Sequence, residues 1–316
     1  MRPFDLTAPA TVEAALGQPG TFLAGGTTLV DLMKLNVMTP RHVLDINDLP
    51  LRGIDTGDGL RIGALERMSD IAQHPGVYPA ISRALLQSAS QQLRNMASIG
   101  GNLLQRTRCG YFRDVNMPCN KRAPGSGCPA VSGANRMHAV LGTSDSCVAT
   151  HASDVAVALV ALDAEIRLVS ASGQRTVRLA DFYRLPGDTP DVENDLRPGE
   201  LITEVVVPRL DWARRSTYVK VRDRQSYEFA LCSAAVALDI QDSRVVDARV
   251  AVGGVATRPW RLTAIEDALR GGPATVEAFE DAAAVAADGA KPLSGNSFKV
   301  SLLKRTVVRA LIEGSR

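Results

Sequence analysis

The sequence is poor in aromatic residues, which make up 4% of the chain, and it has no apolar run long enough to cross a membrane. So few aromatic side chains offer little material for the stacking platforms that bind single-stranded nucleic acid. The net charge of +2 gives no indication of nucleic acid binding either. The first residues, Met1 to Leu6, lack the apolar core of a signal peptide. We therefore expect a globular protein without nucleic acid partners, membrane insertion or an export signal of its own.

Several common site motifs are also missing. The first glycine pair is not followed by Gly-Lys-Ser/Thr, and no Gly-x-Gly-x-x-Gly fingerprint is present. The cysteines form no Cys-x2-Cys pair of the kind that zinc sites usually present on a tight turn. No nucleophile–base pair is evident, and the four histidines are scattered, so we expect neither catalytic residues nor histidine ligands in this chain.

Four of the five cysteines fall in one long irregular stretch, 105–150. Neither a two-residue nor a 3.6-residue period persists through its first 33 residues, which are interrupted by proline and glycine. A loop of this length inside a compact domain is uncommon and is usually functional or disordered. Its Tyr, Phe, Met and Cys content is not typical of disorder, so we expect something to hold it in place. The candidate ligands are Cys109, Cys119, Cys128 and Cys147.

Three ways of holding the loop are open from spacing alone. Disulfides require an oxidising compartment. Zinc requires four ligands, and the gaps of nine, eight and eighteen residues are unusual for it. Iron–sulfur clusters also take four thiolates and accept wider spacing. Neighbouring basic residues would lower the thiol pKa values and offset the charge of a thiolate-bound cluster. The simpler reading, which we favour for any single arginine, is that they form a solvated face of the loop. These residues are Arg106, Arg108, Arg113, Lys121 and Arg122.

Near the N-terminus, a predicted strand, a glycine turn and a helix follow one another. The strand covers 21–24, the turn is Gly25-Gly26-Thr27-Thr28, and the helix covers 29–34. Glycines let backbone N–H groups approach an anion closely, and a helix start adds a favourable partial charge. The arrangement is suited to phosphate, although a Gly-Gly pair by itself is more often only a tight turn.

The remaining pattern predicts two domains of an α+β protein. Residues 1–209 form the first domain, with a small lobe at 1–50 and a larger lobe at 51–209 that contains the cysteine stretch. Residues 210–316 form a second, smaller domain. It has three predicted strands, 217–221, 232–240 and 245–252, followed by three helices. Cys232 lies in an apolar strand and is expected to be a buried core thiol.

Several motifs occur together in an order that is specific to one family. They are Gly25-Gly26-Thr27, Ile62-Gly63-Ala64, Ala97-Ser98-Ile99-Gly100-Gly101-Asn102, Ser153-Asp154, Glu200-Leu201-Ile202 and Tyr218-Val219-Lys220. The set resembles the FAD-binding subunit of the xanthine dehydrogenase family of molybdenum hydroxylases, over essentially the whole chain. The cysteine stretch resembles the subclass that carries a 4Fe–4S cluster there, which includes the flavin subunit of periplasmic aldehyde oxidase. The resemblance implies a two-lobed FAD-binding domain of the PCMH/VAO-like, CO dehydrogenase flavoprotein type and a C-terminal α+β domain.

The resemblance also implies roles for particular residues. A first group would wrap the FAD pyrophosphate with backbone amides: Phe22, Leu23, Ala24, Gly25, Gly26, Thr27, Thr28 and Leu29. Ser98, Gly101 and Asn102 would form a second wall along the cofactor. Asp154 would accept a hydrogen bond from an FAD hydroxyl, Ile202 would touch the flavin, and Lys220 would lie near the isoalloxazine. Cys109, Cys119, Cys128 and Cys147 would ligate the cluster. The residues themselves leave simpler readings open, with Asp154 as a helix cap, Ile202 as strand core and Lys220 as an exposed lysine.

The implied activity is electron transfer within a molybdenum-dependent aldehyde oxidoreductase. A large subunit would carry the molybdenum cofactor, and a small subunit with two 2Fe–2S clusters would deliver electrons. An external acceptor, either a ferredoxin-like protein or oxygen, would receive them. The compartment would be the periplasm, reached with a partner that bears a twin-Arg signal, or the cytoplasm. Two alternatives are a stand-alone FAD oxidoreductase with a zinc-stapled loop and a scaffold with a vestigial flavin site.

Overall fold

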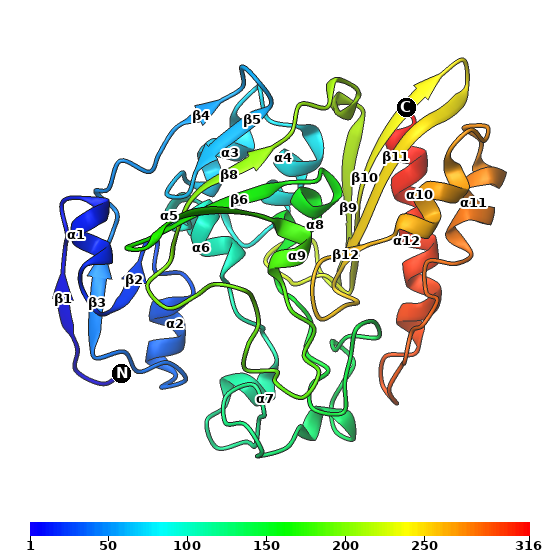
Figure 1. The fold of residues 1–316 in the computed structure, drawn as a ribbon. Helices are drawn as coiled ribbons and strands as arrows, with labels where there is room; N and C mark the ends of the chain where they lie inside the picture. Colours follow the sequence, from blue (N-terminus) through cyan, green and yellow to red (C-terminus); the bar gives the residue numbers. More distant parts are fainter.

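The N-terminal lobe is a small parallel sheet flanked by two short helices, as the computed structural model of residues 1–316 shows (Figure 1). The strand order is β1-β3-β2, and both neighbours run parallel to β3. The first helix begins after Thr11, whose hydroxyl accepts a hydrogen bond from the Ala14 N–H at 3.1 Å. The elements of this lobe are β1 (Asp5–Thr7), α1 (Val12–Leu16), β2 (Thr21–Leu23), α2 (Leu29–Lys34) and β3 (His42–Asp45).

The second lobe is an antiparallel sheet of five strands in the order β4-β5-β8-β6-β7. Helix α8 is buried along its whole length and contributes every one of its residues except Asp154 to the apolar core of this lobe. Because this helix has no exposed face, its sequence is apolar throughout. The strands are β4 (Ile54–Asp55), β5 (Leu60–Gly63), β6 (Glu165–Ser170), β7 (Gly173–Arg178) and β8 (Leu201–Val207). The helices are α3 (Met68–Gln73), α4 (Pro79–Leu86), α5 (Gln91–Met96), α6 (Ile99–Leu103), α8 (Asp154–Ala161) and α9 (Leu179–Phe182).

The C-terminal part is an antiparallel sheet in the order β12-β11-β10-β9, covered on one side by helices (Figure 1). A separate apolar core lies between this sheet and helices α10 to α12. Its strands are β9 (Ser216–Val221), β10 (Cys232–Gln241), β11 (Arg244–Gly253) and β12 (Trp260–Arg261). Its helices are η2 (Asp211–Arg214), α10 (Thr263–Leu269), α11 (Val276–Ala283) and α12 (Phe298–Gly314).

The cysteine stretch, residues 105–150, forms the lower rim of the molecule in Figure 1 and contains only two short helices. These are α7 (Gly110–Arg113) and η1 (Pro129–Val131). The stretch contacts the N-terminal lobe through a small apolar cluster of Leu32, Phe112 and Cys119. It contacts the C-terminal part through Lys299, whose buried Nζ donates to the carbonyl oxygens of Met137 and Gly254. The stretch is therefore packed between the two ends of the chain.

The predicted fold class is confirmed, with differences in detail. The C-terminal sheet has a fourth strand, β12, which was not expected, and β1 and β4 were also missed. Helix α8 is capped by Ser153, whose hydroxyl accepts from the Ala156 N–H at 3.1 Å, so Asp154 is not the cap. No helix in the structure is both long and apolar enough to span a membrane.

Candidate functional site

The largest cavity near the predicted motifs lies beside the glycine turn between β2 and α2. We call it the glycine cavity; its volume is about 680 Å³. The turn can take its shape because Gly26 adopts a φ of +72°, in the left-handed region that favours glycine. A Cβ on Gly25 would lie only 1.9 Å from the carbonyl oxygen of Met96, so the two backbones touch directly at this point. This close approach brings the turn against the segment that leads into α6.

The second wall of the glycine cavity is the start of helix α6. Ser98 caps this helix, and its hydroxyl accepts a hydrogen bond from the Gly101 N–H at 3.2 Å. Gly100 packs against Ala64, with its N–H donating to the Ala64 carbonyl at 2.9 Å, and a Cβ there would lie 3.0 Å from the Ala64 methyl group. Two glycine-rich turns therefore line one cavity. The N–H groups of Gly100 and Gly101 are used within the protein, so the turn at Gly25–Thr28 is the one that can offer amide donors to a ligand.

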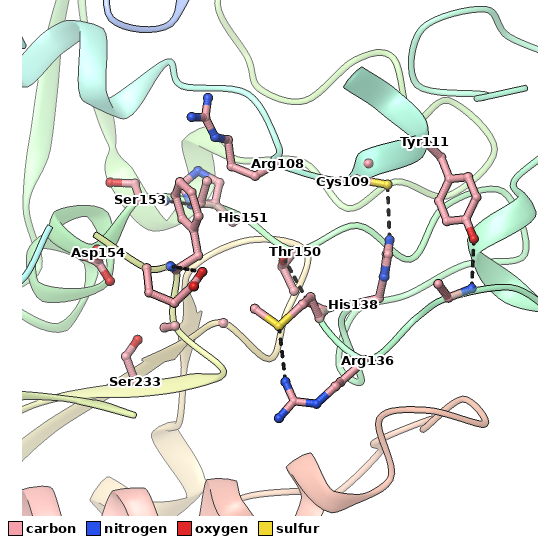
Figure 2. Close-up of a pocket in the computed structure, with 18 of the residues that line it drawn as sticks. Arg108, Cys109, Tyr111, Arg136, His138, Thr150, His151, Ser153, Asp154 and Ser233 are labelled. Atoms are coloured by element: carbon pink, nitrogen blue, oxygen red, sulfur yellow. Dashed lines mark hydrogen bonds between the residues drawn. The ribbon is translucent and has the colours of Figure 1, made fainter. Parts of the chain in front are cut away.

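A second cavity of about 560 Å³, the adjoining cavity, lies between the cysteine stretch, the start of α8 and the segment 228–230 (Figure 2). His151 lines both cavities, and Asp154 lines only the adjoining one. Burial lowers the pKa of His151 to about 3, so its ring is neutral at physiological pH. The ring packs edge-on against Tyr183 with 4.6 Å between centroids. The two cavities thus meet at one neutral, firmly packed side chain.

Asp154 is the centre of a buried polar network. Its carboxylate accepts hydrogen bonds from Tyr218 Oη at 2.6 Å, from Lys220 Nζ at 2.8 Å and from Ser88 Oγ at 2.9 Å. Burial, and then the negative charge of Asp154, raise the pKa of Tyr218 well above its ordinary value. Lys220 also donates to the carbonyl oxygen of Gln87 at 3.1 Å. The network fastens α8 to β9 and to the end of α4, and Lys220 is buried rather than exposed.

The structure brings ten of the fourteen predicted FAD residues together around the glycine cavity. These are Phe22, Ala24, Gly25, Gly26, Thr27, Thr28, Leu29, Ser98, Gly101 and Ile202. Leu23, Asn102 and Lys220 line neither cavity. Asn102 lies next to the site and accepts a hydrogen bond from Ser153 Oγ at 2.5 Å, while Lys220 reaches the adjoining cavity only through Asp154. The individual FAD contacts stay predictions.

The four cysteines of the 105–150 stretch line a single small cavity and carry free thiols. Cys109 also borders the adjoining cavity, and Cys147 also borders the glycine cavity. No group of three or more His, Cys, Asp or Glu side chains is arranged to hold a single metal ion. The fifth cysteine, Cys232, is fully buried in β10, as expected for a core thiol. The predicted convergence of the four thiols is present, and the cluster itself stays a prediction.

The arginines of the stretch form ion pairs and hydrogen bonds with groups other than the thiols. Arg108 and Arg113 bind Asp31 on α2, at 2.8 and 2.7 Å. Arg106 pairs with Glu193 at 2.6 Å, and Arg122 donates to backbone carbonyls, including that of Tyr111 at 2.9 Å.

The expectation that positive charge lowers the thiol pKa values is wrong for two of the four cysteines. Burial raises the pKa of Cys109 to about 11. It also raises the pKa of Cys147, against an opposing effect of Lys121.

Sequence reasoning missed several residues that line the glycine cavity. His151 is half-buried and Tyr183 is buried there, and Arg184 and Arg197 bring positive charge to its rim. His151 lies just before α8, and the other three come from loops after α9 and before β8; no spacing pattern in the sequence connects them with the glycine turns. His138 was also left unassigned, although its Nε2 lies 3.2 Å from Cys109 Sγ.

Comparison with known families defines the class of protein. Residues 2–210 match the FAD binding domain in molybdopterin dehydrogenase, and residues 217–313 match the CO dehydrogenase flavoprotein C-terminal domain. The chain therefore belongs to the FAD-binding subunits of the molybdenum hydroxylase family and is part of an oxidoreductase. Together the matches span nearly the whole chain, as the resemblance seen in the sequence implied.

Individual relatives narrow this class. The chain is 50% identical to the aldehyde oxidoreductase FAD-binding subunit PaoB of Escherichia coli (strain K12), over 95% of this chain and 94% of that protein. It is 32% identical to the glyceraldehyde dehydrogenase medium chain of Sulfolobus acidocaldarius, covering 92% and 86%. Among solved structures, the carbon monoxide dehydrogenase of Hydrogenophaga pseudoflava has a chain that superposes with a TM-score of 0.74 at 26% identity, covering 99% and 98%.

Proposed function

We propose that this chain is the FAD- and 4Fe–4S-binding electron-transfer subunit of a molybdenum-dependent aldehyde oxidoreductase. It would receive electrons from a 2Fe–2S subunit and pass them to an external acceptor. The observation that carries the proposal is that the glycine cavity, the adjoining cavity and the small thiol cavity border one another. Two cavities share His151, and the small cavity of four thiols borders both of them through Cys147 and Cys109. The similarity to an aldehyde oxidoreductase subunit supplies the substrate class.

FAD fits the two larger cavities taken together. The turn at Gly25–Thr28 would hold the pyrophosphate, because its amide N–H groups make no hydrogen bond within the protein. Ser98 and Gly101 would form the second wall along the cofactor. A carboxylate offers about four acceptor sites. Three of those of Asp154 are used by protein donors, which leaves one for the predicted flavin hydroxyl. Lys220 would not contact the flavin directly. It would affect the flavin electrostatically, because its buried positive charge is paired with Asp154 near the adjoining cavity.

The four thiols are the proposed ligands of the cluster. In a 4Fe–4S cluster held by four cysteines each thiolate binds a different iron, so four cysteines around one cavity can serve a cluster without forming a site for a single ion. When bound, FAD supplies two-electron chemistry and the cluster one-electron chemistry. The protein's own contribution is to exclude water and to fix the distance between the two sites.

The partners are proposed by analogy with the relatives. Several relatives are medium chains, such as that of carbon monoxide dehydrogenase. We propose a large molybdenum subunit and a small 2Fe–2S subunit for this chain too, with a ferredoxin-like protein or oxygen as the acceptor. We propose that the complex is exported to the periplasm with a twin-Arg-bearing partner or stays in the cytoplasm.

We also propose the domain division 1–209 and 210–316, with the boundary at the end of β8. Its support is the existence of two large apolar cores, one in the five-stranded lobe and one beneath helices α10 to α12. The short helix η2 connects them. Separate expression of the two ranges, followed by circular dichroism, would test the division; it fails if neither range folds.

The relay is tested with Cys119→Ser in the assembled enzyme, using Cys232→Ser as the matched control. Cys119 is nearly buried at the thiol cavity, whereas Cys232 is a core thiol remote from it. We expect Cys119→Ser to lose turnover with one-electron acceptors while keeping it with two-electron acceptors. Cys232→Ser should keep both. Unchanged turnover of Cys119→Ser with every acceptor would reduce the thiol cavity to a structural element.

A further inference from the structure

The imidazole of His138 lies against one of the four thiols. Its Nε2 is 3.2 Å from Cys109 Sγ, a separation at which a nitrogen–sulfur hydrogen bond forms (Figure 2). Both residues lie in the wall between the small thiol cavity and the adjoining cavity. The imidazole nitrogen is therefore within hydrogen-bond reach of this sulfur.

The backbone of His138 is held on both sides, which fixes where its ring can reach. Its N–H donates to the Asn135 carbonyl at 3.0 Å, and its carbonyl accepts from Asn296 Nδ2 at 3.2 Å. Asn296 is fully buried just before α12, so the C-terminal part of the chain positions this turn of the cysteine stretch. The Tyr111 ring also lies close to the imidazole, with 6.3 Å between the ring centroids.

The protonation of the sulfur decides the direction of this hydrogen bond. A cysteine that ligates a cluster is a thiolate and has no proton to donate. The imidazole can donate from Nε2, the atom that lies 3.2 Å from Cys109 Sγ. With the cluster bound, the imidazole therefore donates to the sulfur rather than accepting from it.

We propose that His138 is a positioning residue that donates a hydrogen bond from Nε2 to the Cys109 sulfur and raises the reduction potential of the cluster. The inference rests on the proposed 4Fe–4S site. Reduction adds negative charge that spreads onto the ligand sulfurs, and a donor aimed at one of them stabilises that added charge. Because the ring lies between the thiol cavity and the adjoining cavity, it also shields this sulfur from the larger space.

The test compares His138→Leu, which removes the donor, with His138→Gln, whose amide nitrogen can occupy the position of Nε2. Tyr111→Phe is the matched control, because its hydroxyl contacts the Ala134 N–H at 2.8 Å and not a sulfur. Iron, sulfide and flavin contents are measured first in the assembled enzyme. The midpoint potential of the cluster is then measured by a redox titration followed by electron paramagnetic resonance.

We expect His138→Leu to contain a full cluster with a lower midpoint potential than the wild type. His138→Gln should restore most of the difference, and Tyr111→Phe should show none. An unchanged potential in a fully loaded His138→Leu variant would overturn the inference. If His138→Leu assembles no cluster, a near-wild-type potential in His138→Gln still supports the donor role, and failure of both variants to load overturns it. A wild-type enzyme without iron and sulfide would instead refute the proposed cluster, and the inference with it.

Discussion

Replacing Gly25 by alanine would put a methyl group 1.9 Å from the carbonyl oxygen of Met96 and 2.9 Å from the Cα of Ala97. These neighbours are backbone atoms, so no side chain can rotate away. To bring the shortest contact back to 3.0 Å, the glycine turn and the segment before α6 must separate by about 1.1 Å. Both are walls of the glycine cavity, so the substitution would widen the cavity beside the glycine turn.

Overpacking of this kind costs about 1–3 kcal/mol. If that cost falls on the geometry that binds FAD, affinity falls by about 5- to 150-fold, since 1.4 kcal/mol is a factor of ten. The assay is a fluorescence titration with FAD after the bound flavin has been removed. Gly17→Ala is the matched control, because the nearest neighbour of a Cβ there is the Glu13 carbonyl oxygen, at an ordinary distance of 3.4 Å. Wild-type FAD affinity in a stably folded Gly25→Ala protein would refute the reasoning.

Three further changes test the electrostatics around the site. Lys220→Met should destabilise the fold by about 3–5 kcal/mol, because it leaves the buried carboxylate of Asp154 without its cation. Denaturant unfolding measures this loss. A loss under about 1 kcal/mol, the usual size for a surface ion pair, would contradict the prediction. The hydrogen bond from Arg113 holds the pKa of Asp31 below its usual range. The loss of stability in Asp31→Asn should therefore be constant above about pH 4, the ordinary aspartate pKa. It should vanish as the pH falls through the lowered pKa of Asp31. A loss that does not depend on pH would show that the charge of Asp31 does not cause the stabilisation. Burial lowers the pKa of Lys299 from 10.5 to about 8. Between these pH values the unfolded chain holds a proton that the folded chain has lost, so the free energy of unfolding rises with pH. Relative to Lys299→Met, the wild type should gain ~3 kcal/mol across that window, and parallel stability curves would refute the shift.

Local signals predicted most elements, because helices and strands with a buried face carry their own period. Helix α2 has the predicted bounds, Leu29–Lys34, and strand β9, Ser216–Val221, starts one residue before the predicted 217–221. Strand β1 was missed because its three residues are exposed and it exists only through pairing with β3, a partner about 37 residues away. Strand β12 has two residues and likewise depends on its neighbour, β11. Elements that are held by a distant partner leave no pattern of their own in the sequence.

The candidate site also has features that the sequence predicted and features that depend on distant partners. The convergence of the four cysteines was predictable because one stretch contains them all and needs something to hold it. The partners of its basic residues were not, since Asp31 and Glu193 lie 77 and 87 residues from Arg108 and Arg106. His138 lies 29 residues from Cys109 inside an irregular loop, and its orientation depends on Asn296, near the other end of the chain. Contacts of this kind form only when the N-terminal lobe, the cysteine stretch and the C-terminal part pack together.

The central claim is that this chain holds a flavin and an iron–sulfur cluster side by side. Quantitative analysis of iron, acid-labile sulfide and FAD in the purified protein tests it most directly, together with the visible spectrum. We expect about four iron and four sulfide per chain, the content of a cluster held by four thiolates, with flavin absorbance. Zinc without sulfide would contradict the account, because the cysteine stretch would then be a structural staple beside a flavin site.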